Sequence, residues 1–309
     1  MRAVTMAETT FRTGIGNRAA TPTIDAKTCN LCGLCVKVCG TGLRLREDAV
    51  VFDDDAIAGC IGCGQCMAVC PTGSITVTGR RISPDMRLSM PPLATAATPD
   101  QLESLLLRRR SVRSYDRREV EKEVVDRIVR MASTAPMGIP PSDVSVIAFI
   151  GREEVGKFRE DVLDFFKTMS RRYFNRVTLK LMRPFVKKVE YEMLRDFIRP
   201  VVEEYEKARG AGGDVLFYDA PLVLVFHASP YADPTDASIA ATYAMLAAES
   251  LGLGTCLNGM VPVLGYSKKL KMKYGIPKDN TVSLGMMIGY PAVKYQRALR
   301  RDFASVAYH

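Results

Sequence analysis

The stretch CNLCGLCVKVC, residues 29–39, decides how the first part of this chain folds. A second stretch, CIGCGQCMAVCP, residues 60–71, repeats its cysteine spacing, C-x2-C-x2-C-x3-C. Every cysteine of the first run has a counterpart 31 residues later, as 60 − 29 shows for the first pair. Eight of the nine cysteines lie in these two runs, and the ninth is Cys256. The two runs are therefore halves of an internal repeat that brings thiols together.

Thiolates in this number and spacing suit cubane iron–sulfur clusters. Three cysteines two residues apart let a short loop present three of the four thiolates that a 4Fe-4S cluster needs. Paired C-x2-C units also bind zinc, but two runs of four would oversupply tetrahedral zinc sites. A disulfide framework would need an oxidising compartment, and the start MRAVTMAETTFRTG has no apolar stretch typical of a secretion signal. We therefore expect two clusters in a cytoplasmic protein.

Over about residues 23–82 the chain resembles bacterial-type two-cluster ferredoxins. In those proteins the last cysteine of each run ligates the cluster of the other run. The resemblance thus implies two crossed ligand sets: Cys29, Cys32, Cys35 and Cys70 for one cluster, and Cys60, Cys63, Cys66 and Cys39 for the other. The second run ends in the usual Cys-Pro pair, whereas the first ends in Cys39-Gly40. We expect this departure to alter local rigidity rather than ligation.

The composition fits one further domain behind the cluster module. Of 309 residues, 47% are hydrophobic and 25% charged, as in ordinary globular proteins. No apolar run reaches the roughly 18 residues of a membrane span. The net charge of +9 counts cysteines as neutral, and two oxidised clusters would add four negative charges, leaving about +5 (9 − 4). Nucleic acid is not an expected partner, because no helix-turn-helix or RNA-recognition pattern is present.

The pattern along the chain predicts four segments: a flexible tail at 1–22, the cluster module at 23–82, a proline-rich linker at 83–100 and a second domain at 101–309. In the module, residues 43–55 predict a hairpin and SITVTG a closing strand.

The second domain shows both helical and strand patterns. Helices are predicted after residue 101, over 119–136 and over 234–254, the second with an apolar face of Val120, Val124, Val125, Ile128 and Met131. The apolar runs 144–151 and 221–228 predict strands covered on both faces, and 282–291 a third central strand. The fold class is therefore α+β.

Four motifs in this second domain resemble, in their order, the nitroreductase family of FMN proteins. They are RRSVR at 109–113, APMG at 135–138, LGLGTC at 251–256 and GYPAVKYQRALRR at 289–301. The resemblance covers about residues 101–309. The whole chain resembles the subgroup in which a ferredoxin module precedes a nitroreductase domain.

The resemblance implies an FMN site. Because guanidinium groups bind phosphate oxygens in bidentate fashion, Arg109, Arg110 and the Ser111 hydroxyl would hold the flavin phosphate. Arg113 would stabilise negative charge on the reduced ring. Further implied contacts are Pro136, Met137, Gly138, Leu253, Gly254, Arg297 and Arg301, with Gly252 and Gly254 letting a backbone N–H approach the ring. Many family members have an Asn-x-Gln-Pro type sequence where this chain has IPPSDV, residues 139–144, so contacts from that loop are expected to differ.

The two resemblances together imply an oxidoreductase. An external low-potential one-electron donor would supply electrons through the clusters to FMN, and hydride transfer from N5 would reduce a nitroaromatic, quinone or activated alkene. The resemblance also implies a homodimer with flavin at the subunit interface. The alternative is an electron-transfer subunit that turns over no small molecule.

The remaining features leave alternatives open. Residues 167–188 contain eight Lys or Arg and no Asp or Glu, which suits a lid over the flavin, a membrane-surface helix or a solvated face; we favour the lid. His227 and Cys256 are expected to be structural rather than catalytic. Three tyrosines could donate a proton to substrate, and the sequence does not choose among Tyr243, Tyr290 and Tyr295.

Overall fold

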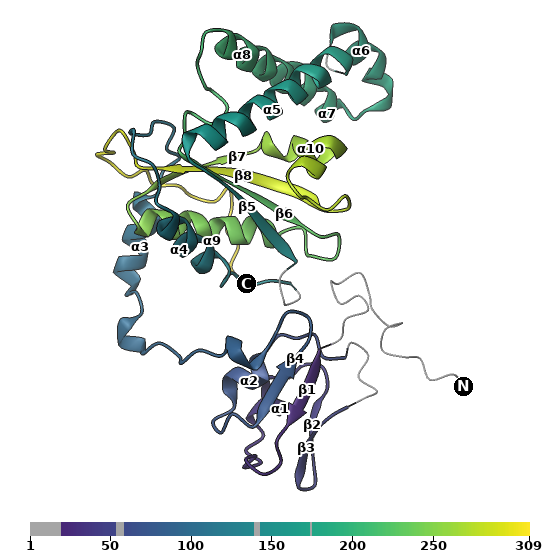
Figure 1. Ribbon diagram of the computed structural model, residues 1–309, viewed down its shortest axis with the longest axis vertical. Coiled ribbons are helices and arrows are strands. Elements are labelled where there is room, and N and C mark those ends of the chain that lie inside the picture. The colour runs from purple at the N-terminus through teal and green to yellow at the C-terminus, as the bar shows by residue number, and fades with distance from the viewer. Residues whose placement is uncertain (1–19, 54–58, 139–142, 174) are drawn as a thin grey trace.

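The computed structural model describes residues 20–53, 59–138, 143–173 and 175–309. Most of the predicted tail and four residues of the IPPSDV loop, 139–142, lie outside these ranges. Figure 1 shows a small module of short strands and helices, followed by an extended stretch and a larger domain built around one sheet.

Two antiparallel strand pairs and two short helices form the module. Strand β1 (Thr21–Ile24) pairs with β4 (Ile75–Thr78), and β2 (Leu43–Arg46) pairs with β3 (Ala49–Phe52), which confirms the predicted hairpin and closing strand. Helices α1 (Leu34–Val38) and α2 (Gln65–Val69) each follow a glycine with positive φ, Gly33 at 69° and Gly64 at 71°. Because β1 begins at Thr21, the predicted module boundary at residue 23 falls inside a strand.

The linker contains two short 3-10 turns, η2 (Pro84–Met86) and η3 (Leu93–Thr95), and residues 87–98 are exposed. Helix α3 (Pro99–Arg108) then begins inside the segment predicted as linker. Its start is fixed by a capping box in which Thr98 and Gln101 exchange side-chain and backbone hydrogen bonds.

A four-stranded antiparallel sheet with the order β5-β6-β8-β7 forms the centre of the second domain. Its strands are β5 (Val144–Ile150), β6 (Leu222–Ala228), β7 (Gly254–Asn258) and β8 (Thr281–Gly289). Every residue of β6 is buried, as predicted. Both faces of β5 are covered, as predicted, since Phe149 packs in the core on one face and Val146 and Ile150 pack on the other. Only Phe149 is fully buried, because β5 is an edge strand.

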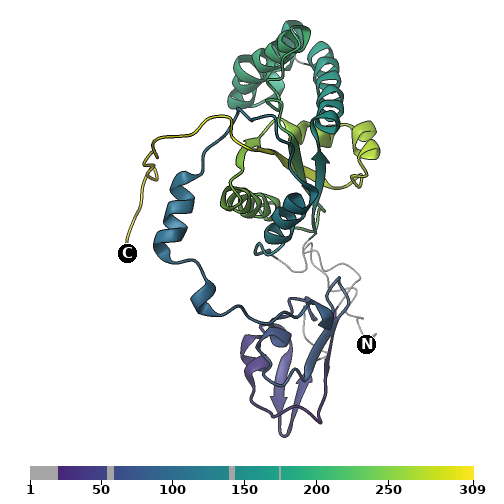
Figure 2. The ribbon, with the colours of Figure 1, turned by 60° about the vertical axis from the view of Figure 1, so that its left-hand side comes forward.

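Helices cover both faces of the sheet (Figures 1 and 2). Helices α4 (Lys122–Ala132) and α9 (Asp236–Ser250) pack on the face that receives Leu222, Leu224 and Phe226 of β6. The other face packs against α5 (Arg152–Arg172), α8 (Arg199–Gly210), η6 (Val261–Tyr266) and α10 (Lys268–Lys273). In α4 the predicted apolar face is partly wrong: Met131 is 40% exposed, and Ala132 is buried instead.

The long connection between β5 and β6 is helical. After α5 come α6 (Arg176–Met182), η4 (Arg183–Phe185), α7 (Lys188–Met193) and the π-helical turn η5 (Leu194–Ile198), which leads into α8. The basic segment 167–188 runs from the end of α5 to the start of α7. Its apolar side chains Val177, Leu181 and Phe185 are 69%, 68% and 87% exposed, while its Phe174 lies outside the described residues. In the described part of the chain, no helix combines the length and apolarity needed to cross a membrane.

Candidate functional site

The thiols of the two cysteine runs gather into two mixed groups. A cavity of about 180 Å³ is lined by Cys39 of the first run together with Cys60, Cys63 and Cys66 of the second. In the other group, Cys70 of the second run lies close enough to Cys35 to raise the pKa of that thiol, an effect smaller than that of burial. Cys29 acts on Cys35 in the same way. The structure therefore brings together Cys39, Cys60, Cys63 and Cys66 in one group and Cys29, Cys35 and Cys70 in the other, while Cys32 is exposed.

The last cysteine of each run is positioned by the end of a helix. Cys39 and Cys70 are the C-cap residues of α1 and α2, and both have extended backbone angles that turn the chain away from the helix axis. The chain then folds back, so that the N–H groups of Gly42 and Leu43 each donate to Cys39 Sγ over 3.4 Å. Although burial raises the pKa of Cys70, hydrogen bonds from the Thr72 hydroxyl and from neighbouring backbone N–H groups lower it to about 7.

The chemistry of these donors suits a cationic iron–sulfur core. Burial, and then the nearby thiols Cys60, Cys63 and Cys39, raise the pKa of Cys66 to about 12. Four thiolates would therefore repel one another in this cavity unless a positive group lay among them. No three Cys, His, Asp or Glu side chains in the described ranges have the spacing for a single metal ion.

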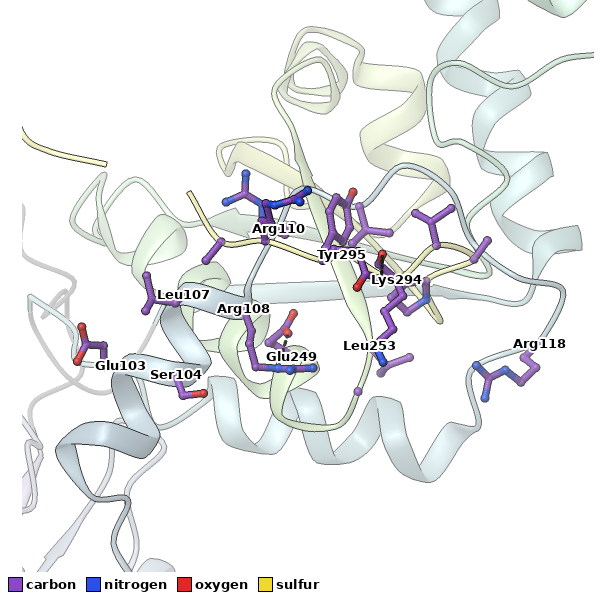
Figure 3. Close-up of a pocket in the computed structure, with 18 of the residues that line it drawn as sticks. Glu103, Ser104, Leu107, Arg108, Arg110, Arg118, Glu249, Leu253, Lys294 and Tyr295 are labelled. Atoms are coloured by element: carbon purple, nitrogen blue, oxygen red, sulfur yellow. Dashed lines mark hydrogen bonds and ion pairs between the residues drawn. The ribbon is translucent and has the colours of Figure 1, made fainter. Parts of the chain in front are cut away.

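A second cavity, of about 850 Å³, lies beside α3, the end of α9 and residues 291–298 (Figure 3). Five cationic side chains line it: Arg108, Arg110, Arg118, Lys294 and Arg297. Acidic groups are also present, and burial raises the pKa of Glu249 although Arg108 lies 4.0 Å from that carboxylate. Of the residues that the resemblance places at the flavin, Arg110, Gly252, Leu253 and Arg297 line this cavity.

The basic loop 109–113 is held against the edge of β7. The Val112 N–H donates to the Thr255 carbonyl over 2.8 Å, and Ser111 and Thr255 form a parallel bridge. Gly254 is required for this contact, because a Cβ at that position would lie 2.5 Å from Val112 Cγ2. The RRSVR and LGLGTC motifs, about 140 residues apart in sequence, therefore lie side by side as the resemblance implies.

Gly252 lines the cavity and also ends helix α9. Its φ is 79°, its N–H donates to the Glu249 carbonyl over 3.0 Å, and the Leu253 N–H donates to the Ala248 carbonyl over 2.9 Å. These bonds form the glycine C-cap of α9. Neither N–H is thus free to approach a flavin ring.

Several predicted FMN contacts lie away from the cavity. Arg109 Nη1 lies 3.7 Å from Met245 Sδ, Arg113 Nη1 donates to the Ser111 carbonyl over 3.5 Å, and Arg301 is exposed. Ser111 is also exposed. None of these four lines the cavity.

The APMG motif lies at the opposite end of α9 from Leu253. The Gly138 N–H donates to Asp236 Oδ1 at the start of this helix over 3.0 Å, and Pro136 and Met137 directly precede Gly138. The 15 residues of α9 span about 22 Å. Within a single chain, Pro136, Met137 and Gly138 therefore lie about one helix length from Leu253 and the residues near it.

Among the tyrosines, Tyr295 lines the cavity and is 48% exposed. The Tyr290 hydroxyl instead donates to Glu121 Oε2 over 3.1 Å, and Tyr243 is 39% exposed on α9. Tyr295 is thus the tyrosine of the three that lies at the cavity.

His227 and Cys256 are both buried away from solvent. His227 Nδ1 lies 2.9 Å from Asn280 Nδ2, and burial, followed by the charge of Lys271, lowers the pKa of His227. Burial raises the pKa of the Cys256 thiol, so that this thiol stays protonated. Neither residue lines the cavity.

Comparison with known families identifies both parts of the chain. The model of the nitroreductase family matches residues 106–290, more than half of the 309 residues, and the chain belongs to this family. A 4Fe-4S dicluster domain matches residues 21–71. The chain is thus a nitroreductase-family oxidoreductase with a ferredoxin-type module ahead of it. No curated protein matches.

Among solved structures, a nitroreductase with bound FMN from Bacteroides fragilis is similar at 16% identity, with 67% of this chain and 99% of that chain covered and a TM-score of 0.49. A nitroreductase with bound FMN from Desulfitobacterium hafniense is similar at 18% identity. The match covers 67% of this chain and 97% of that chain, with a TM-score of 0.48. An FMN-dependent nitroreductase from Clostridium difficile is similar at 22% identity. The match covers 67% of this chain and 98% of that chain, with a TM-score of 0.42.

Proposed function

We propose that the chain is an iron–sulfur flavoprotein that passes electrons from an external one-electron donor to a small electrophilic acceptor. Two 4Fe-4S clusters would carry single electrons, and FMN would supply two-electron hydride chemistry at N5, suited to nitroaromatics, quinones and activated alkenes. The observation that supports this proposal is the presence, in one chain, of two thiol groups that mix the two cysteine runs and of a cationic cavity in a nitroreductase domain.

The residues divide the work between the two sites. The crossed thiol sets, Cys29, Cys32, Cys35 and Cys70 with Cys60, Cys63, Cys66 and Cys39, would hold the clusters. At the cavity, Arg110 and Arg297 would bind phosphate oxygens, and the nearby Arg108, Arg118 and Lys294 add positive charge that was not assigned to the site from the sequence. Tyr295 would be the proton donor to substrate, because it lines the cavity whereas Tyr243 and Tyr290 do not.

We also propose that two copies complete each flavin site. Pro136, Met137 and Gly138 lie about a helix length from Leu253 in one chain, so a second copy would have to supply one of the two groups. The exposed apolar side chains of the basic segment, Val177, Leu181 and Phe185, fit a lid over the partner's site. A reducing cytoplasm would keep all these cysteines available as ligands.

The first test is the visible spectrum of anaerobically purified protein, with iron, sulfide and flavin counted per chain. We expect about eight irons and one FMN, both bleached by dithionite, and reoxidation by a model quinone. Iron without flavin, even after FMN is supplied, would contradict the oxidoreductase proposal. Iron and flavin that no acceptor reoxidises would favour an electron-transfer subunit.

A matched pair of arginine variants tests the cavity. Arg110→Ala should weaken FMN binding by about 10- to 100-fold, because a charge-assisted bond to phosphate contributes about 1.5–3 kcal/mol. Arg130→Ala removes an exposed arginine on α4 and should leave FMN binding unchanged. Iron content should equal that of the unmodified protein in both variants. Equal flavin affinity in both variants would place the phosphate elsewhere.

A further inference from the structure

The turn that follows each cysteine run has the same construction. Thr41 lies two residues after Cys39, and its Oγ1 is 3.5 Å from Cys39 Sγ. Thr72 lies two residues after Cys70, and its Oγ1 is likewise 3.5 Å from Cys70 Sγ. A thiolate has no hydrogen to give and a hydroxyl rotates to suit its partner, so each threonine is the donor once the cysteine is a ligand.

Backbone N–H groups complete the surroundings of both sulfurs. Gly42 and Leu43 donate to Cys39, and backbone groups of Thr72, Ser74 and Ile75 hydrogen-bond Cys70. These donors are fixed by the path of the chain and would survive most substitutions. The threonine hydroxyl, in contrast, is supplied by a side chain and can be removed without altering the backbone.

Each threonine serves the group of thiols that belongs mainly to the other run. Cys39 lines the same cavity as Cys60, Cys63 and Cys66, so the Thr41 hydroxyl points at a sulfur of the second run's group. Cys70 lies with Cys35 and Cys29, so Thr72 acts on the first run's group. Each threonine therefore contacts a neighbouring cysteine whose sulfur lies with cysteines of the other run.

Resting on the proposed two-cluster function, we propose that Thr41 and Thr72 are a matched pair of tuning residues, each raising the reduction potential of the cluster to which the opposite run contributes three ligands. Reduction adds one electron to a cluster and breaks no bond. Because the reduced cluster is more negative, a hydrogen bond donated to its sulfur stabilises the reduced form more than the oxidised form.

The two contacts differ in what lies behind the hydroxyl. Thr72 Oγ1 is 2.5 Å from the hydroxyl of Ser74, which is only 5% exposed. Ser74 can donate to Thr72 while Thr72 donates to Cys70, and such chains strengthen each bond within them. Ser74→Ala should therefore shift the Cys70 cluster in the same direction as Thr72→Val, but by less.

The test is a redox titration of the full-length, cluster-loaded protein, followed by electron paramagnetic resonance. Cys32→Ser changes a ligand of the first run alone and marks which transition belongs to that cluster. Thr72→Val should lower the reduction equilibrium constant of the marked transition several-fold, and Thr41→Val that of the other transition, with about 59 mV for each tenfold change. Thr41→Ser and Thr72→Ser retain the hydroxyl and should keep the original potentials.

Thr76→Val is the matched control, because the Thr76 hydroxyl donates to the Thr23 carbonyl rather than to sulfur. Its potentials should equal those of the unmodified protein. Unchanged potentials in both cysteine-turn valine variants would overturn the proposal, as would a shift of the same transition by both. If the valine variants lose iron while the serine variants keep it, the hydroxyl is structural and the tuning role is wrong. Absence of iron from the unmodified protein would instead overturn the proposed function.

Discussion

The cluster module and the nitroreductase domain are stabilised by different means. The buried core of the module consists of Ala20, Cys35, Leu43, Val50, Cys66, Met67, Ile75 and Val77, and other cysteines of the runs pack against it. The domain instead has an apolar layer on each face of its sheet, with Phe149 and Phe158 stacked at 3.9 Å between ring centroids. The module is thus built around its proposed ligands, whereas the domain has a core of its own and holds its cavity at the surface.

The largest expected effect follows from this difference. Removing iron with a chelator under anaerobic, reducing conditions should unfold the module, because thiols in its core would lose the group that they surround. Hydrogen exchange should show that the amides of β4 lose protection entirely while those of β6 keep it. Cys66→Ala should do the same without a chelator.

Cys256→Ala is the control for that experiment, since Cys256 is equally buried but lies in the other domain. It should leave iron content and β4 protection unchanged. Protection of β4 that persists in iron-free protein would show that the small apolar core of the module is sufficient, and the contrast between the two regions would fail.

A core substitution in the domain should have the next largest effect. Phe158 is 1% exposed and stacks on Phe149 and Phe217, with Tyr274 edge-on. Phe158→Ala should lower the free energy of unfolding of the domain by about 3–5 kcal/mol, because it leaves a cavity among aromatic rings. Urea unfolding followed by exchange of the β5 and β6 amides measures this change.

Phe185→Ala provides the comparison within the same domain. Phe185 is 87% exposed, so its removal should change stability by less than about 0.5 kcal/mol. Iron content should remain constant in both variants. A stability loss in Phe185→Ala as large as that in Phe158→Ala would mean that the exposed ring is covered in solution.

Local patterns were sufficient to predict much of the fold. Cysteine spacing identified the module, and continuous apolar runs identified β6 and β8, because burial on both faces leaves a direct record in the sequence. The same reasoning held for the two faces of β5, but its position at the sheet edge was not predicted, because that position depends on which strands pair beside it. Strand β7 was not predicted, since its five residues begin at the glycine of a motif already interpreted as a turn.

The site was predictable where a motif forms its own local structure. The mixing of the two cysteine runs was implied by the resemblance to two-cluster ferredoxins, and Arg110 and Leu253 line one cavity because Val112 binds Thr255. Arg108 and Lys294 were missed, because only the path of residues 291–298 past α3 makes them neighbours. The helix-cap role of Gly252 was not assigned, because a helix cap and a flavin-binding turn require the same residue type.

The smallest expected effect concerns a polar group inside the apolar domain. Burial and Lys271 lower the pKa of His227 below its ordinary value near 6.5, so the fold favours the neutral ring. His227 therefore contributes stability that is present above pH 6.5 and is lost as the pH falls below it, by up to about 1.4 kcal/mol per pH unit. Exchange of β6 amides at pH 7.5 and 5.5 should show a loss of protection that is smaller in His227→Gln.

His309→Gln changes the only other histidine and should keep the full pH dependence. Equal pH dependence in both variants would assign the loss of stability in acid to the carboxylates, and His227 would then make no contribution to it.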